Sequence, residues 1–412
     1  MTRLYVRDSV STKQNNSKPF WSPVYWPSQL FFLIMRLLAF LPYPAIHRLG
    51  ILMGKAMYRL AKSRVRIAQI NIKKCFPHLS EVEQENLVKQ NLISTGIGML
   101  ETAMLWFGPK RNWDNRLIIE GMEHLEQAKA NGKGGLLLSF HLTSLEIGGS
   151  LLGTQMELAA LYRKNEKALI EHKMTKGRGQ YVHPIARENT RAMVRWIKKN
   201  GFVWYAADQD YGRKQSIFVP FFNIPTATIT ATTRFVKLTG APVIPMTQQR
   251  IGNGKKIKVT LHPPLENMGT DAEQDAITIN RFLEHYLKQH PEDYLWIHRR
   301  FKTRPTLSSP SFYPKKKKGR QVTPNRYRDI IEAAEWIEEK DGKPYRLKEK
   351  EALIYFYYRK ETLFADKLGK HAKAWGETLD SETIDNQTFK FQGLTRYCPS
   401  QKCDLVYLEL SS

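Results

Sequence analysis

Short apolar runs alternate with longer amphipathic segments between residues 116 and 289. The short runs have the length of strands and lack a polar face, which is typical of strands that are buried on both sides. In the longer segments apolar residues recur every three or four positions, the period of a helix with one buried face. This alternation predicts an α/β fold in which helices flank a mostly parallel or mixed central sheet.

The individual elements follow from where each pattern starts and stops. We expect strands at residues 116–120, 136–140, 158–162, 202–206, 243–246 and 257–261. We expect helices at residues 123–130, 168–176, 189–199, 227–238 and 271–289, and helical periodicity also resumes after His141. Two capping boxes, Ser80 with Glu83 and Thr270 with Glu273, mark helix starts, and the helix after Ser80 runs to about Trp106.

The N-terminal region combines aromatic, apolar and basic residues in the order expected of a membrane anchor. Aromatic residues within 21–26 precede an apolar run at 30–41, which Arg36 interrupts and Pro42 ends. The run is shorter than the roughly 20 apolar residues that a spanning helix needs. A basic amphipathic stretch follows at 46–66, so we expect helices that anchor the chain in the membrane interface. The alternatives are a single span of residues 21–44 and a buried helix pair.

The character of the chain changes after Pro305. Residues 306–327 are rich in proline and lysine and are expected to be a linker. Residues 328–412 have hydrophobic content of their own, with a helix expected at 328–339 and strands at 352–358 and 405–410. The predicted organisation is therefore a tail with anchoring helices (1–66), a main domain (67–305), a linker (306–327) and a C-terminal extension without an assigned role (328–412).

Charge and cysteine content narrow the classes of partner. The formal net charge is +25, and residues 306–412 contribute only +4 of it, so the positive charge belongs to the main body. Such a body attracts polyanions, and because no nucleic-acid-binding module is recognisable, anionic lipid is favoured over nucleic acid. The three cysteines have no metal-binding spacing, so we expect no disulfide framework, no metal and no cofactor.

His141 and Glu146 are the most informative pair of polar residues. His141 directly follows the strand expected at 136–140, and Glu146 lies five residues later. Because five residues along a helix correspond to roughly 140° around its axis, the two side chains meet only if His141 precedes the helix. A carboxylate that binds one imidazole nitrogen leaves the other nitrogen to accept a proton. We therefore predict a general base, although a strand-end histidine with an unrelated glutamate nearby has the same spacing.

Two common catalytic motifs are missing from the sequence. It contains neither the G-x-S-x-G elbow of serine hydrolases nor the H-E-x-x-H helix of zinc proteases. We therefore expect His141 to activate a hydroxyl of the substrate rather than a hydroxyl of the protein. An activated acyl donor such as a thioester suits this chemistry.

Three separated segments carry a resemblance to a known family. Residues 140–146 (FHLTSLE) look like the HX4D/E acyltransferase motif, and residues 203–212 (VWYAADQDYG) and 294–305 (YLWIHRRFKTRP) are longer and rarer. Together they resemble the lipid A biosynthesis lauroyl acyltransferases of Gram-negative bacteria. The resemblance covers residues 21–305 and leaves 306–412 outside it. Glu146 stands where broader glycerolipid acyltransferases carry Asp, which favours the lipid A branch.

The resemblance implies a glycerolipid-acyltransferase-like fold and a late acylation step on the cytoplasmic face of the bacterial inner membrane. A fatty acyl chain, by this resemblance lauroyl, would move from acyl carrier protein to a hydroxyl of Kdo2-lipid IVA. His141 would be the general base and Glu146 would orient it. By position in the motifs, Arg178 and Asp208 would be further functional residues that bind substrate.

Arginine residues are the candidates for binding the anionic groups of such an acceptor, because a guanidinium donates paired hydrogen bonds to phosphate and carboxylate. Besides Arg178, the candidates for binding the acceptor are Arg163, Arg213, Arg299 and Arg300. The basic surface would also attract acidic acyl carrier protein and anionic membrane lipid. The alternatives are acylation of a glycerolipid, myristoyl transfer to lipid A, and a basic membrane-binding protein without catalysis.

Overall fold

The computed structural model describes residues 26–213, 216–306 and 309–314 and, beyond them, six strands between residues 335 and 410. The chain divides into two compact units. The first consists of residues 1–305 with 311–313, and the second of residues 306–310 with 314–412.

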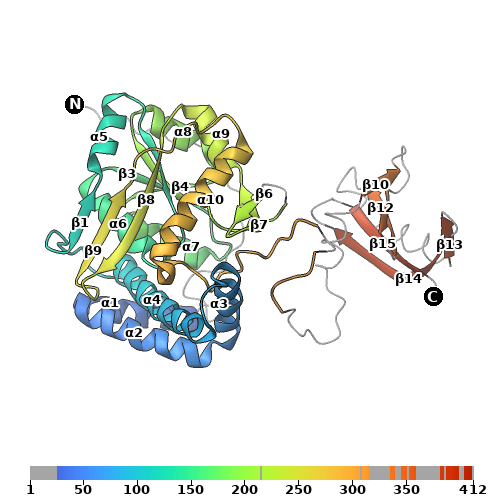
Figure 1. The fold of residues 1–412 in the computed structure, drawn as a ribbon, viewed down its shortest axis with the longest axis horizontal. Coiled ribbons are helices and arrows are strands. Elements are labelled where there is room, and N and C mark those ends of the chain that lie inside the picture. Colours follow the sequence, from blue (N-terminus) through green and yellow to red (C-terminus); the bar gives the residue numbers. More distant parts are fainter. Residues whose placement is uncertain are drawn as a thin grey trace. The chain divides into compact units, whose positions relative to one another are not determined.

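A seven-stranded sheet forms the centre of the first unit, in the order β1-β9-β8-β2-β5-β3-β4 (Figure 1). Its strands are β1 (Leu117–Glu120), β2 (Gly135–Ser139), β3 (Leu158–Tyr162), β4 (His183–Ala186), β5 (Phe202–Ala206), β8 (Val243–Ile251) and β9 (Lys256–Leu261). Neighbouring strands are parallel, except that β8 and β9 are antiparallel. All five residues of β2 are buried, as its apolar run predicted. The expected α/β fold with a mostly parallel, mixed sheet is confirmed.

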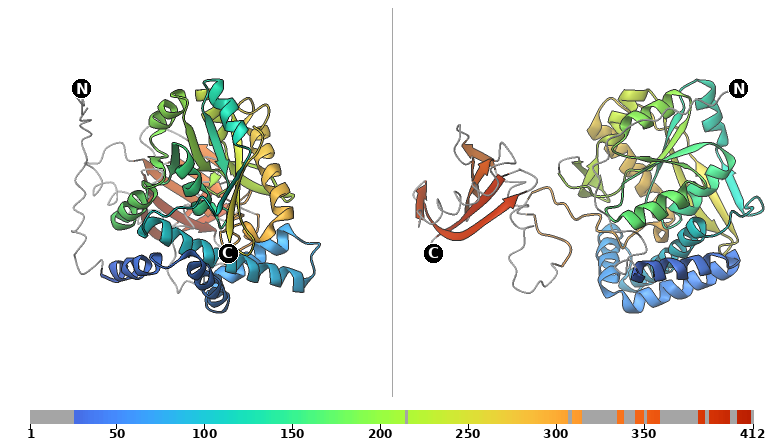
Figure 2. Two further views of the ribbon diagram at one scale, coloured as in Figure 1. Left: turned by 90° about the vertical axis from the view of Figure 1, so that its left-hand side faces the viewer. Right: turned by 180° about the vertical axis from the view of Figure 1, so that it is seen from behind.

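Helices cover both faces of this sheet (Figure 2). They are α5 (Met122–Ala130), α6 (Leu145–Gln155), α7 (Ala168–Arg178), α8 (Thr190–Lys198), α9 (Ala231–Thr239) and α10 (Ala272–Gln289). Leu136 and Leu138 of β2 belong to a core that includes residues of α8, α9 and α10. Leu137 belongs to a second core, with residues of α5 and α6. The alternation follows because successive strand residues point to opposite faces of a sheet.

Four further helices form an N-terminal layer: α1 (Trp26–Ala39), α2 (Tyr43–Leu60), α3 (Lys62–Cys75) and α4 (Glu81–Phe107). The capping box of Ser80 and Glu83 opens α4, as predicted. Helices α2 and α4 approach closely at glycine residues. A Cβ atom on Gly54 would lie 2.3 Å from the Cα atom of Ile93, and one on Gly96 would lie 2.5 Å from the carbonyl oxygen of Gly50. Side chains at these positions would force the two helices apart.

Helix α1 packs on the unit with one side and exposes apolar residues on the other. The ring of Phe32 lies 5.6 Å from that of Phe107 at the end of α4, and Met35 and Leu38 pack against the buried core. The exposed apolar residues of α1 are Trp26, Leu30, Phe31, Leu33, Ile34 and Leu37. In the part of the chain that the structure describes, no helix combines the length and the apolar character needed to cross a membrane.

Two expected helix starts and ends differ from the structure. The amphipathic helix expected at 46–66 is divided between two helices, α2 and α3, which separate at Ala61. Asn71 of α3 donates hydrogen bonds to the carbonyls of Trp296 and His298. The capping box of Thr270 and Glu273 is wrong, since Asp271 accepts the hydrogen bond from the backbone N–H of Glu273. Thr and Asp both cap helices well, so the sequence does not choose between neighbours.

Two strand features have weak signals in the sequence. The hairpin of β6 (Ser216–Phe221) and β7 (Ile224–Ile229) turns at Phe222 and Asn223, which both have positive φ. Such turns usually contain Asn or Gly at both central positions. Because Phe222 occupies the first of them, the sequence does not indicate a turn here. The helix expected at 227–238 begins only at Ala231, because the residues before it pair in β7. Strand β4 contains Pro184, which an edge strand tolerates.

The second unit contains a six-stranded antiparallel sheet in the order β10-β11-β12-β15-β14-β13. The strands are β10 (Glu335–Glu338), β11 (Tyr345–Glu349), β12 (Ala352–Tyr358), β13 (Ser381–Ile384), β14 (Gln387–Cys398) and β15 (Cys403–Leu410). The expected strand at 352–358 is confirmed, and that at 405–410 lies within β15. The helix expected at 328–339 is wrong at residues 335–338, which pair with β11. Its other residues and most of the expected linker lie outside the described residues.

Candidate active site

His141 lies where two neighbouring parallel strands end. Strands β2 and β5 pair with Ser139 beside Ala206, and His141 and Asp208 each follow their strand by two residues. The two residues therefore lie together at the carboxyl edge of the sheet, where α/β proteins place ligand-binding groups. The Nδ1 atom of His141 lies 2.8 Å from the Oδ1 atom of Asp208. The backbone N–H of His141 donates to both carboxylate oxygens of Asp208 at 3.1 Å.

Asp208 is a buried carboxylate whose charge is compensated by its neighbours. Its exposed fraction is 1%. Burial alone would raise its pKa, but His141 and the positive charge of Arg300 outweigh burial and lower the pKa of Asp208 to about 2. The ionised carboxylate accepts a hydrogen bond, which assigns the imidazole proton to Nδ1. Nε2 of His141 is then the nitrogen that can accept a proton.

Glu146 binds a different partner, so the expected pairing of His141 with Glu146 is wrong. Arg178 donates from Nε to Oε1 of Glu146 at 2.8 Å and from Nη2 to Oε2 at 2.7 Å. The indole N–H of Trp106 donates to Oε1 at 2.7 Å. The physical reason is the direction of α6, whose first turn carries Glu146 toward the C-terminal end of α7, where Arg178 is the last residue.

Glu146, Arg178 and Trp106 form a charge-balanced cluster beside His141. Burial alone would raise the pKa of Glu146, but the charge and hydrogen bonds of Arg178 outweigh it and lower that pKa. The guanidinium of Arg178 also lies over the ring of Trp106, 5.7 Å from its centroid. Within the described residues, Nη1 of Arg178 makes no hydrogen bond, although its other two nitrogens do. The cluster thus fixes a guanidinium of which one amino group can bind a further acceptor.

Three more of the predicted arginine residues, Arg163, Arg299 and Arg300, have different environments. Arg163 follows β3 with an exposed side chain and lies 3.6 Å from Glu166. Arg299 is half-buried, with its guanidinium 5.7 Å from the ring centroid of Tyr313. Arg300 is fully buried and donates to the carbonyl of Ala227 at 2.7 Å. The guanidinium of Arg300 thus binds β7 in this structure, and its expected role in binding substrate stays a prediction.

Hydrogen bonds hold the segment 203–212 and the following Arg213 against the segment 294–305. The carboxylate of Asp210 accepts hydrogen bonds from the backbone N–H and the hydroxyl of Thr303, at 2.6 and 2.7 Å. Arg213, another candidate for binding the acceptor, donates to the carbonyl oxygens of Arg304 and Pro305, at 2.6 and 2.7 Å. These bonds bring two of the three motif segments together beside the third, which contains His141.

His298 is a histidine of this region that the sequence did not single out. Its backbone N–H donates to the carbonyl of Leu295 at 2.9 Å, and the N–H of Leu295 donates to the carbonyl of His141 at 3.0 Å. Burial, reinforced by the neighbouring His141 imidazole and the Arg300 guanidinium, lowers the pKa of His298 to about 4. Among the described residues its buried Nε2 atom has no hydrogen-bond partner. The sequence gives no indication that the neutral imidazole of His298 lies near His141, and only the tertiary structure shows it.

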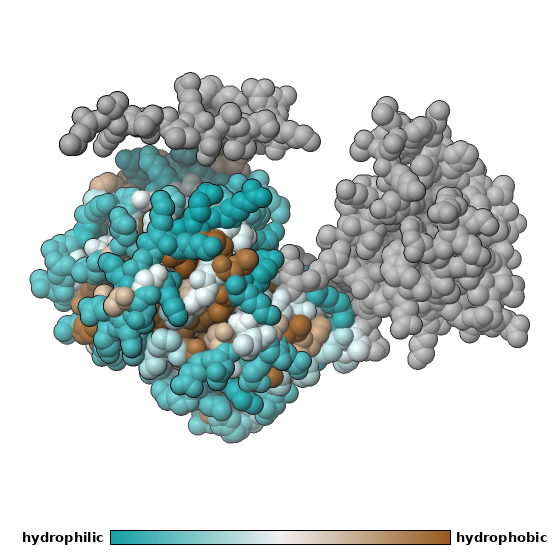
Figure 3. All heavy atoms as spheres, turned by 90° about the horizontal axis from the view of Figure 1, so that it is seen from above, coloured by the Kyte–Doolittle hydropathy of each residue, from teal (hydrophilic) through white to brown (hydrophobic). Residues whose placement is uncertain are grey.

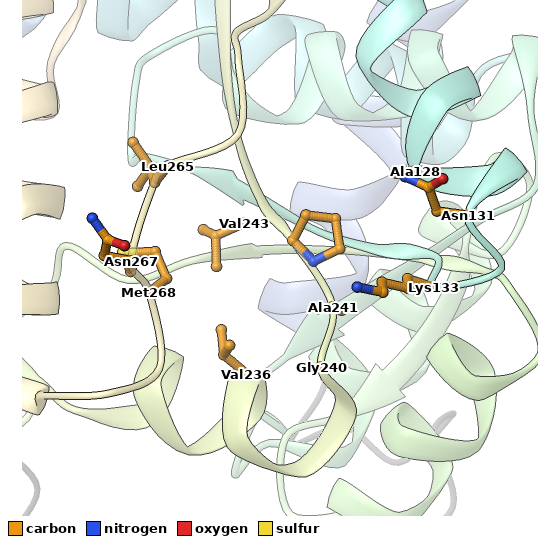
Figure 4. Close-up of a pocket in the computed structure, with 11 residues that line it drawn as sticks. Ala128, Asn131, Lys133, Val236, Gly240, Ala241, Val243, Leu265, Asn267 and Met268 are labelled. Atoms are coloured by element: carbon orange, nitrogen blue, oxygen red, sulfur yellow. The ribbon is translucent and has the colours of Figure 1, made fainter.

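A separate hollow lies at the opposite end of the sheet. Figure 3 views the unit from above, the end at which α5, α8 and α9 lie in Figure 1, and shows apolar residues gathered within a hydrophilic surface. A cavity of about 320 Å³ includes Lys133, just before β2, and Val243, the first residue of β8 (Figure 4). Since His141 follows the other end of β2, this cavity is not part of the site around His141.

The arrangement around His141 can remove a proton from a hydroxyl. The buried carboxylate of Asp208 orients the imidazole. The guanidinium of Arg178, which Glu146 holds in place, can donate a hydrogen bond to an oxygen that carries negative charge. Within the described residues, no three His, Cys, Asp or Glu side chains are grouped so that they could hold a metal ion.

The chain is similar to a set of known bacterial proteins. Residues 13–303 match the family described as bacterial lipid A biosynthesis acyltransferase. The lipid A biosynthesis lauroyltransferase of Escherichia coli K12 is 37% identical over 286 residues, which cover 69% of this chain and 94% of that protein. The palmitoleoyltransferase of the same organism is 36% identical over 295 residues, covering 71% and 96%. Its myristoyltransferase is 27% identical over 310 residues, covering 72% and 95%.

Proposed function

Given that this chain belongs to the bacterial lipid A biosynthesis acyltransferase family and is an acyltransferase, we propose that it transfers a lauroyl chain from acyl carrier protein to a hydroxyl of Kdo2-lipid IVA. The observation that carries the proposal is the hydrogen bond between Nδ1 of His141 and the buried carboxylate of Asp208. It leaves one imidazole nitrogen available for the proton of the acceptor hydroxyl.

In the proposed step, Nε2 of His141 takes the proton of the acceptor hydroxyl while the hydroxyl oxygen attacks the thioester carbonyl. The carbonyl oxygen gains negative charge in the tetrahedral intermediate. When the carbon–sulfur bond breaks, the imidazolium returns the proton to the departing thiolate. The products are an ester on the acceptor and a free thiol on the carrier. Asp208 stabilises the transient imidazolium and does not itself take up the proton.

Arg178 is proposed to bind an anionic oxygen during this reaction. Its bidentate pairing with Glu146 fixes the plane of the guanidinium, and Nη1 can donate to the thioester carbonyl or to an acceptor phosphate. In this proposal Glu146 acts by positioning Arg178, and the exposed Arg163 and half-buried Arg299 bind anionic groups of the acceptor farther from the reacting atoms.

The chain is also proposed to act at the cytoplasmic face of the inner membrane. The exposed apolar side of α1 runs along a helix whose other side packs on α4. A helix packed in this way suits attachment in the plane of the interface. The basic main body would attract anionic lipid and acidic acyl carrier protein.

The central test replaces His141 and Asp208 separately. Purified His141→Ala and Asp208→Asn variants are expected to lose about 10²- to 10⁴-fold in the rate of lauroyl transfer, with wild-type thermal unfolding for His141→Ala. Glu126→Gln, an exposed carboxylate on α5 away from His141, is the matched control and should retain full activity. Full activity of His141→Ala would overturn the assignment of the base.

A double-mutant comparison separates the roles of the two carboxylates. If Glu146 acts through Arg178, Glu146→Gln should cost little further activity in an Arg178→Lys background. A full additional loss there would contradict that role.

Two further measurements identify the acyl chain and the acceptor. Mass spectrometry of the lipid product reports the acyl chain. Lysophosphatidate offered beside the tetraacylated lipid A precursor identifies the acceptor. Preference for lysophosphatidate would instead support glycerolipid acylation.

A further inference from the structure

The turn that follows His141 is held by side chains from distant parts of the chain. Arg250 donates from Nη2 to the carbonyl oxygen of Thr143 at 2.8 Å and from Nη1 to its hydroxyl at 3.2 Å. The hydroxyl of Ser94 on α4 lies 2.5 Å from that of Thr143 and accepts from Nη1 of Arg250 at 3.0 Å. Helix α4 also comes close here, since a Cβ atom on Gly98 would lie 2.0 Å from the carbonyl oxygen of Thr143.

The positive charge of Arg250 is balanced inside the protein. The side chain of Arg250, near the end of β8, is 8% exposed, and that of its partner Glu101 is 1% exposed. Nη2 of Arg250 donates to Glu101 at 2.6 Å, and Nε donates to both carboxylate oxygens at 2.9 and 3.0 Å. The hydroxyl of Tyr43 on α2 donates to the same carboxylate at 2.8 Å.

A buried ion pair of this kind is poorly explained by stability alone. Removing two charges from water costs as much as their attraction returns, and apolar residues of similar volume often stabilise a protein equally well. Apolar residues in place of Arg250 and Glu101 could not donate the hydrogen bonds that Arg250 makes to Thr143 and Ser94. The contacts between Arg250 and the turn are therefore the feature that the ion pair adds.

The position of this turn bears directly on His141. The backbone N–H of His141 donates to Asp208, and its carbonyl accepts from the N–H of Leu295. Thr143 lies only two residues later, and its own N–H donates to the carbonyl of Asp293 at 2.6 Å. A shift of Thr143 would therefore rotate the backbone of His141 and misalign the imidazole with Asp208. A misplacement of about 1 Å in a reacting group can cost about 10²-fold in rate.

We propose that Arg250 is a positioning residue, which with Glu101 and Tyr43 fixes the turn at Thr143 and so holds the imidazole of His141 in its reactive orientation. The effect on acyl transfer rests on the proposed function, whereas the effect on His141 itself does not. Through Tyr43, the same network joins helix α2 of the N-terminal layer to the turn after the base.

The test removes the network without leaving an unpaired charge. The double variant Glu101→Leu with Arg250→Met keeps the volume of the pair but has no donor for Thr143. We expect it to remain folded and to lose at least 10-fold in kcat with little change in KM. Thr143→Val, which removes only the hydroxyl acceptor, should show a smaller loss of the same kind.

A measurement without substrate separates this proposal from the proposed function. Diethyl pyrocarbonate modifies neutral imidazoles, and peptide mass spectrometry gives its rate at His141 relative to the exposed His285. The double variant should change this ratio at least 3-fold. A folded double variant with wild-type reactivity at His141 would overturn the proposal, even if the wild-type protein acylates another acceptor. Wild-type kcat in that variant would overturn it as well.

Discussion

At the scale of single residues, the partner of His141 is 67 positions away in sequence, at Asp208, although Glu146 is five positions away. The motif places an acid close to the histidine along the chain, and the register of β2 with β5 places another acid closer in space. Glu146 instead compensates the charge of Arg178. The spacing of a motif therefore identifies which residues gather at the site but not how they pair.

Asp293, whose carbonyl holds Thr143, leads to a prediction for stability. Burial raises the pKa of its carboxyl group to about 6, although the hydrogen bond from Tyr286 opposes the shift. A raised pKa in the folded state means that the stability contributed by Asp293 is full below the unfolded value of 3.8 and is lost as pH rises through about 6. The ionised carboxyl group is thus expected to destabilise the fold at pH 7.5.

We expect Asp293→Asn to raise the free energy of unfolding at pH 7.5 by about 2–3 kcal/mol, because the amide keeps an acceptor for Tyr286 without a buried charge. At pH 4.5 the gain should be much smaller. Urea unfolding at both pH values measures the difference, with the exposed Asp114→Asn as the control. An equal gain at both pH values would show that the charge of Asp293 is not its cause.

At the scale of elements, close approach between α2 and α4 depends on glycine. Gly54→Ala should lower the melting temperature, because its Cβ atom would overlap the backbone of Ile93 and overpacking costs about 1–3 kcal/mol. A lower melting temperature would be informative, because helix propensity alone favours alanine over glycine by about 1 kcal/mol and so predicts a rise. Ala56→Leu, which adds bulk on an exposed position of the same helix, is the control. A rise in melting temperature for Gly54→Ala would contradict the described crossing.

At the scale of the whole molecule, the first unit extends beyond Pro305 to include Tyr313. The buried hydroxyl of Tyr313 donates to Asn71 at 2.6 Å and accepts from the backbone N–H of Phe301 at 3.0 Å. A chain that ends after residue 305 should therefore be about 3–5 kcal/mol less stable than one that ends after residue 314. Thermal unfolding compares them, and Tyr313→Ala in the longer chain should reproduce the loss. Equal stability would show that Tyr313 is dispensable.

The exposed side of α1 gives a second prediction for the whole molecule. Replacing Leu30, Phe31 and Leu37 together by Ser should strongly reduce co-sedimentation with vesicles containing anionic lipid, because the buried apolar area is lost. Val82→Ser removes an exposed apolar side chain at the start of α4 and serves as the control. Added salt should weaken the remaining, electrostatic binding. Unchanged sedimentation of the triple variant would exclude α1 as the attachment site.

The sequence by itself determined the α/β class, the positions of most strands and helices in the first unit, and four polar residues of the candidate site, His141, Glu146, Arg178 and Asp208. It could do so because apolar periodicity is local, and because residues that end parallel strands gather at one edge of the sheet. Only the tertiary structure decided that Asp208 orients His141, that Glu146 holds Arg178, and that Arg250 binds the turn at Thr143. Those pairings depend on strand register and helix direction, which bring together residues that no local pattern connects.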